Sequence, residues 1–91
     1  MKEQMVIVIN EKDNVAVALL DIAAGAEVVL PDGGRFEAVN DVPYSHKVAL
    51  IDIAEGGPVI KYGESIGEAA REIRKGECVH THNLKSEEAQ R

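Results

Sequence analysis

The chain has 91 residues, of which 16 are acidic and 10 are basic, so its formal net charge is −6. This length suits one compact domain, and the acidic balance argues against binding to nucleic-acid phosphates or to an anionic membrane. The single cysteine, Cys78, excludes an internal disulfide, and we expect it to be a small, half-buried side chain.

The first half of the chain predicts short strands joined by turns. Residues 5–9 (MVIVI) are a continuous apolar run, and a polar turn at 10–14 separates them from a second run at 15–20. This pattern predicts an antiparallel hairpin. Further short strands are expected at 28–30 and 35–39, on either side of the turn sequence PDGG. A loop at 41–45 (DVPYS) then leads to His46.

The second half predicts strands at 47–51, 59–62 and 79–83. The segment 64–74 is ambiguous, because Glu68 to Glu72 are good helix formers. Gly67 weakens a short helix, and a repeated motif described below aligns 66–71 with strands, so we predict a strand there. We expect one domain over residues 1–84 and a polar tail over 85–91.

A short corner unit occurs three times: an acidic residue, isoleucine, two variable residues, glycine, two variable residues and valine. The copies are Asp21–Val28, Asp52–Val59 and Glu72–Val79. The isoleucine is expected to pack inward, the glycine to take a positive φ in a turn, and the valine to open the next strand. The unequal spacing argues against a solenoid, and the unit predicts a mainly β domain.

His80-Thr81-His82-Asn83 is the most informative polar cluster. Residues two apart in a strand point to the same face, so His80 and His82 would present two imidazoles side by side, with Asn83 at the strand end. That arrangement suits a metal ion, a carboxylate or a polyol. The competing interpretation is two exposed histidines near a terminus, since two ligands do not complete a metal site.

Three other residues carry weaker signals. Lys61 precedes Tyr62 and is able to bind a carboxylate as a point charge, although an ordinary strand lysine fits equally well. His46 precedes a central strand and is by default an exposed loop histidine. The sequence has no P-loop, dinucleotide-binding glycine pattern, Ser/His/Asp set or CxxC pair.

Residues 46–84 resemble the N-terminal domain of the altronate and galactarate dehydratase family. The resemblance rests on the runs HKVAL, PVIKYG and VHTHNL, whereas residues 5–30 resemble the family only in outline. The corner unit is also typical of the SAF superfamily. The resemblance therefore implies an SAF-type β-clip fold. The chain stops where the large catalytic domain of the dehydratases would begin.

The resemblance implies a lyase that converts a 2-hydroxy acid into a 2-keto acid by β-elimination, in complex with a large catalytic subunit. It implies catalytic roles for His80 and His82, and substrate binding by His46, Lys61, Tyr62 and Asn83. A divalent metal, iron or manganese, is implied for the full complex, with His80 and His82 as candidate ligands. The isolated chain is expected to be inactive.

Several alternatives remain open at this stage. The chain is also similar to the small subunit of sulfolactate sulfo-lyase. Two other function classes are a non-catalytic module that binds carbohydrate acids and an assembly domain that binds a protein. We expect a cytoplasmic location without membrane association, because no apolar run approaches the roughly 20 residues that span a bilayer. Homo-oligomer formation stays open, since so small a chain buries a modest fraction of its surface.

Overall fold

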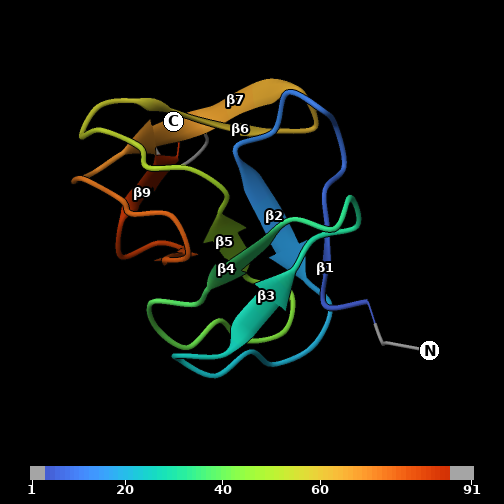
Figure 1. Cartoon of the computed structure of the whole chain (residues 1–91). Helices are drawn as coiled ribbons and strands as arrows, with labels where there is room; N and C mark the ends of the chain where they lie inside the picture. Colours follow the sequence, from blue (N-terminus) through green and yellow to red (C-terminus); the bar gives the residue numbers. More distant parts are fainter. Residues whose placement is uncertain (1–3, 87–91) are drawn as a thin grey trace.

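The computed structural model describes residues 4–86 and contains nine short strands (Figure 1). Residues 4–86 contain no helix, so none that could cross a membrane. The mainly β prediction is confirmed, including a strand in the ambiguous segment. The strands are β1 Val6–Ile7, β2 Val15–Ala18, β3 Glu27–Val29, β4 Arg35–Glu37, β5 Lys47–Ala49, β6 Pro58–Lys61, β7 Glu64–Ala69, β8 Cys78–Val79 and β9 Leu84–Ser86.

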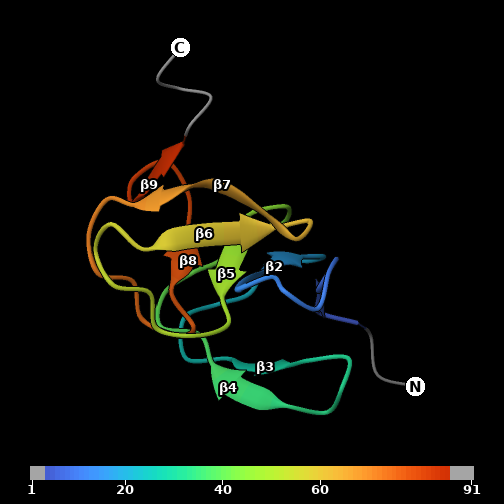
Figure 2. The same cartoon turned by 90° about the horizontal axis from the view of Figure 1, so that it is seen from above.

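The strands form three antiparallel sheets. The central sheet has the order β1-β2-β5-β8, and the outer sheets are β3-β4 and β6-β7-β9. Figure 2 shows the β3-β4 pair on one side of β2 and β5, and the β6-β7-β9 sheet on the other. The predicted hairpin of β1 and β2 is confirmed, with Ile7 opposite Val17.

Strand alternation divides the core into two clusters, one on each face of the central sheet. In β5 and β8, Val48 and Cys78 belong to the first cluster, whereas Ala49 and Val79 belong to the second. Neighbouring residues of a strand point to opposite faces, so one short strand serves both clusters. The side chains are nearly all small aliphatic ones, which pack closely enough to build two cores in so small a chain.

The corner unit occurs four times rather than three. In the three predicted copies the glycines have φ values of 85°, 81° and 90°, and each isoleucine and closing valine is buried. The fourth copy, Asp41–Val48 (DVPYSHKV), has the same local structure, but Val42 replaces the isoleucine and Ser45 replaces the glycine. Sequence analysis missed it because of these two substitutions.

The four units form two pairs. The two members of each pair contact each other through an isolated antiparallel bridge. Ile22 pairs with Val42, and Ile53 pairs with Ile73. In the first pair, the acidic first residue of each unit supports the turn of its partner, since Asp21 Oδ1 accepts a hydrogen bond from the Tyr44 N–H at 2.8 Å. Asp41 Oδ1 accepts one from the Ala24 N–H at 2.9 Å. The acids are therefore part of the scaffold.

Ser45 has a φ of 71°, a left-handed conformation at the position where the other three units have glycine. We expect Ser45→Gly to raise the free energy of unfolding by about 0.5–1 kcal/mol, because relief of left-handed strain outweighs the greater freedom of glycine in the unfolded chain. Urea unfolding of the wild type, Ser45→Gly and Ser45→Ala measures this. A Ser45→Gly variant less stable than the wild type would contradict it.

The prediction of a last strand over 79–83 is wrong beyond Val79. Residues 80–83 form a bend and a turn, in which the His80 carbonyl accepts hydrogen bonds from the N–H groups of Asn83 at 3.1 Å and Leu84 at 2.9 Å. The chain then continues into β9, which sequence analysis did not predict. Lys85 and Ser86 of the predicted polar tail lie in β9, and the rest of that tail lies outside the described residues.

Candidate functional site

The central sheet brings His46 and His80 together. Lys47 is opposite Val79 in the antiparallel register of β5 and β8, so the residues just outside this pair, His46 and His80, are also cross-strand neighbours. Their rings are stacked, with centroids 4.0 Å apart and planes 12° from parallel. Both side chains are half-buried. The sequence suggested each histidine separately, but only the strand register joins them.

Asn83 holds the turn that carries His80. Its side chain is fully buried, its Oδ1 accepts a hydrogen bond from the His80 N–H at 2.9 Å, and its Nδ2 donates to the Cys78 carbonyl at 2.8 Å. Nδ2 also donates to Glu77 Oε2 at 3.1 Å. Asn83 therefore positions His80 and presents no exposed atom to a substrate, in contrast to the direct binding role that the sequence suggested.

His82 lies in the same turn, and its side chain is exposed. The expectation that His80 and His82 share one strand face is wrong, because the chain leaves the strand geometry after Val79. The 2.0-residue period that supports the expectation holds only within an extended segment. The turn replaces the predicted His80–His82 pair with a His46–His80 pair.

Lysines adjoin the histidines. Lys47 is half-buried on β5, and its charge and that of Lys61 on β6 act on each other. Lys61 Nζ lies 5.1 Å from the centroid of the Tyr62 ring, and Tyr62 is 60% exposed with a φ of 59°. Sequence analysis named Lys61 and Tyr62 but missed Lys47, whose position directly after His46 was its one visible signal.

Positive charges and burial disfavour protonation in this cluster. Burial, followed by the charges of His46, Lys47 and His82, lowers the pKa of His80 below its ordinary value. Burial and then the charge of Lys61 lower the pKa of Lys47. The stacked pair therefore favours a neutral imidazole at His80, which is the form that accepts a proton.

We expect the His80 imidazole to titrate below the ordinary value of about 6.5, and His46→Ala to raise the pKa of His80 by removing a neighbouring charge. In the wild type, the lowered pKa of folded His80 means that the unfolded chain binds the imidazole proton more tightly than the folded chain does. The free energy of unfolding should therefore fall as the pH drops through about 6.5 toward the pKa of folded His80. Proton NMR titration of the imidazole ring hydrogens measures the pKa of His80 in the wild type and in His46→Ala. A His80 pKa at or above the ordinary value would contradict this expectation.

The described residues do not form a metal centre by themselves. Within residues 4–86, no group of three or more histidine, cysteine or acidic side chains is placed to hold a metal ion. The two stacked rings also do not chelate, because each nitrogen lone pair lies in its own ring plane and nearly parallel planes do not converge on one ion about 2 Å from both nitrogens.

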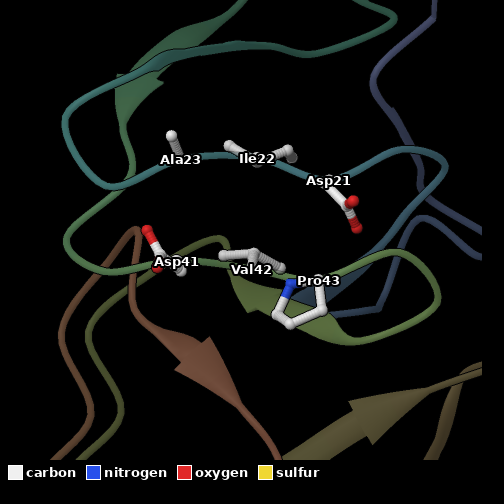
Figure 3. A pocket seen from close by; sticks show the side chains of 6 residues that line it. All are labelled: Asp21, Ile22, Ala23, Asp41, Val42 and Pro43. Atoms are coloured by element: carbon white, nitrogen blue, oxygen red, sulfur yellow. The ribbon is translucent and has the colours of Figure 1, made fainter.

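A surface hollow of about 410 Å³ lies between the paired corner units Asp21–Val28 and Asp41–Val48. Two facing segments line it, Asp21–Ala23 and Asp41–Pro43, and Figure 3 shows their side chains on opposite sides of the opening. The carboxylates at its rim are those that hydrogen-bond to the partner turns. None of the sequence-predicted site residues lines the hollow. The lining of the hollow and the position of its carboxylates are explained by the pairing of the corner units, so we assign no catalytic or binding role to it.

Cys78 is buried in the first core cluster, and burial raises the pKa of its thiol. A raised pKa reduces the fraction of the reactive thiolate. Cys78 is therefore a small core side chain, as the sequence predicted, and is more deeply buried than expected.

The sequence of this chain is similar to that of proteins of known family. Residues 4–87 match the altronate/galactarate dehydratase SAF domain family. The chain is 49% identical over 78 residues to altronate dehydratase of Escherichia coli K12, covering 86% of this chain and 16% of that protein. It is 41% identical over 71 residues to the L-threo-forming galactarate dehydratase of the same organism, covering 78% of this chain and 13% of that enzyme.

A shorter relative is the alpha subunit of (2R)-sulfolactate sulfo-lyase from Paracoccus pantotrophus. It is 46% identical over 52 residues, which cover 57% of this chain and 78% of that subunit. The chain thus spans less than a fifth of the length of the dehydratases but most of this subunit. The match over residues 4–87, together with the antiparallel all-β fold, shows that the chain belongs to the SAF domain family of altronate and galactarate dehydratases.

Proposed function

We propose that this chain forms one wall of the active site of a hydroxy-acid lyase and works with a large catalytic polypeptide. The observation that carries the proposal is the stacked His46–His80 pair beside Lys47, in a chain of the dehydratase SAF family. The substrate class is a sugar acid of the altronate or galactarate type. The isolated chain is inactive because it lacks a complete acid–base set.

The proposed reaction is a β-elimination. A base removes the proton from C2, which bears the hydroxyl and adjoins the carboxylate, and an enediolate forms. Its electron pair then expels the C3 hydroxyl as hydroxide, which takes the proton removed from C2 and leaves as water. The resulting enol loses its hydroxyl proton and gains one at C3 to become a 2-keto acid. The enediolate is the species that most needs stabilisation, since negative charge develops on the carboxylate oxygens.

The residues of this chain suit two of these tasks. His80, with its lowered pKa, is the base that accepts the C2 proton, and His46 stacks against it to fix its ring. Lys47 and Lys61 provide ammonium groups that attract the carboxylate as charge develops on it. Tyr62, which is 60% exposed, contacts the rest of the substrate, whereas the exposed His82 takes no part in the chemistry.

The iron or manganese that the resemblance implies would have to be held chiefly by the large polypeptide, because the described residues of this chain do not supply three ligands. Such an ion would polarise the substrate carboxylate. We therefore assign no step of the proposed mechanism to a metal bound by this chain alone.

A second candidate is the small-subunit role in a sulfolactate sulfo-lyase. Its support is the alignment with the Paracoccus pantotrophus alpha subunit, which is 46% identical over 52 residues. The chemistry changes only in the leaving group, as sulfite departs from C3 instead of hydroxide. The same residues would act on the C2 proton and on the carboxylate.

A chimera tests the proposal. This chain replaces the matching region of Escherichia coli altronate dehydratase, and turnover is measured with altronate, galactarate and (2R)-sulfolactate. We expect the chimera to eliminate at least one substrate within about tenfold of a natural lyase, and the isolated chain to eliminate none. A folded chimera that is inactive on all three substrates, or turnover by the isolated chain, would overturn the proposal.

A further inference from the structure

The hairpin of β1 and β2 packs only one of its two faces against the first core cluster. On the face toward the first core cluster, alternate residues pack inward, namely Val6, Val8, Ala16, Ala18 and Leu20. The residues between them belong to neither core cluster, although they are also large and apolar: Ile7, Ile9, Val17 and Leu19. We call these four residues the β1–β2 patch.

The patch exists because the outer sheet covers only part of the central sheet. Val15, on the same face of β2 as Val17, is buried in the second cluster beneath the β6-β7-β9 sheet. Two residues further along, Val17 is only half-buried, and Leu19 is 39% exposed. The β6-β7-β9 sheet therefore covers the start of β2 but not its end, where Val17 and Leu19 are partly accessible to solvent.

β1 extends the bare area sideways. Ile7 lies directly opposite Val17 in the antiparallel register and is 39% exposed, and Ile9 is 37% exposed. Three of the seven exposed large hydrophobic residues among residues 4–86 therefore lie on this one hairpin. A sheet face with clustered apolar side chains is a typical protein-interaction surface.

The patch borders one residue of the candidate site, Lys47. Val17 is opposite Lys47 in the register of β2 and β5, so the row Ile7, Val17, Lys47 crosses three strands on one face. A partner seated on the apolar end of this row would reach the edge of the site at Lys47. It would also bury Lys47 further from solvent.

We propose that the β1–β2 patch is the surface on which the large catalytic polypeptide packs, with apolar side chains of its own. This inference rests on the proposed function. The occupant follows from two observations. The relatives carry this domain within a polypeptide about six times longer, or as one subunit of a lyase. The patch also adjoins Lys47, which needs further groups from another polypeptide to complete the site.

Thiol labelling tests the proposal in the chimera described above. Ile7→Cys places a thiol in the patch, and Val39→Cys is the matched control, because Val39 is 53% exposed and lies after β4, where its N–H donates to the Gly76 carbonyl. Labelling at each site is measured by peptide mass spectrometry in the free chain and in the chimera. The native Cys78 is buried and serves as an internal reference.

We expect labelling of Ile7→Cys to slow at least about tenfold in the chimera, and that of Val39→Cys to change less than about threefold. Equal slowing at both sites, or none at Ile7→Cys, would overturn the proposal even if the chimera is active. Protection of Ile7→Cys already in the free chain, with sedimentation as a dimer, would assign the patch to a second copy and also overturn it. Protection in an inactive chimera would support docking while the proposed function fails.

Discussion

Gly76→Ala is expected to destabilise the domain by more than about 3 kcal/mol, a large part of the roughly 5–14 kcal/mol available to a chain of this length. Gly76 has a φ of 90°, and a Cβ atom there would collide with the carbonyl oxygen of Glu37. Backbone atoms on both sides must then move, because neither is the flexible end of a side chain. Left-handed strain adds a further penalty.

Gly25→Ala is the matched control. Gly25 occupies the same position of its corner unit, with a φ of 85°, but an added Cβ would meet nothing within 4 Å. We expect it to lose only about 1–2 kcal/mol, which is the strain alone. Urea unfolding followed by circular dichroism compares the two variants. Equal losses of stability would show that the approach to Glu37 has no energetic effect.

His80→Ala and His46→Ala are each expected to lower turnover of the chimera by about tenfold to a hundredfold. His80 is the proposed base, and His46 holds its ring in the stacked geometry. A base acts in the transition state, so kcat should fall more than KM rises. His82→Ala is the comparison, because His82 is exposed in the same turn, and we expect turnover within about threefold of the wild type.

The measurement is steady-state turnover with the substrate that the wild-type chimera uses best. Circular dichroism and the unfolding midpoint control for misfolding of each variant. A larger loss in His82→Ala than in His80→Ala would return the catalytic role to the exposed histidine. The stacked pair would then be a structural feature of the β5–β8 junction.

Local signals in the sequence were sufficient for most of the fold. The three corner units with glycine are recognisable because one residue type meets the demand for positive φ. The same unit aligned 66–71 with strands and correctly outweighed helix propensity, since β7 is held between β6 and β9. The fourth unit escaped because Ser45 takes the glycine conformation, which its residue type does not reveal.

The candidate site depends on long-range contacts, which is why the sequence gives it only in part. His46 and His80 are 34 positions apart and meet through the register of β5 and β8, which no local pattern encodes. The turn at His80 exists because Asn83 buries its amide beneath it. That hydrogen bonding overrides the extended conformation that the closing valine of the corner unit, Val79, predicts. Lys47 comes close to Lys61 and His80 only in the folded chain, so no local pattern indicates its place in the site.

The decisive measurement is turnover of the chimera that carries both His46→Ala and His80→Ala. If the stacked pair acts as one unit in the active site, the double variant should lose about tenfold to a hundredfold, little more than either single variant, because residues that act together are not additive. A folded double variant that retains wild-type turnover would contradict the claim.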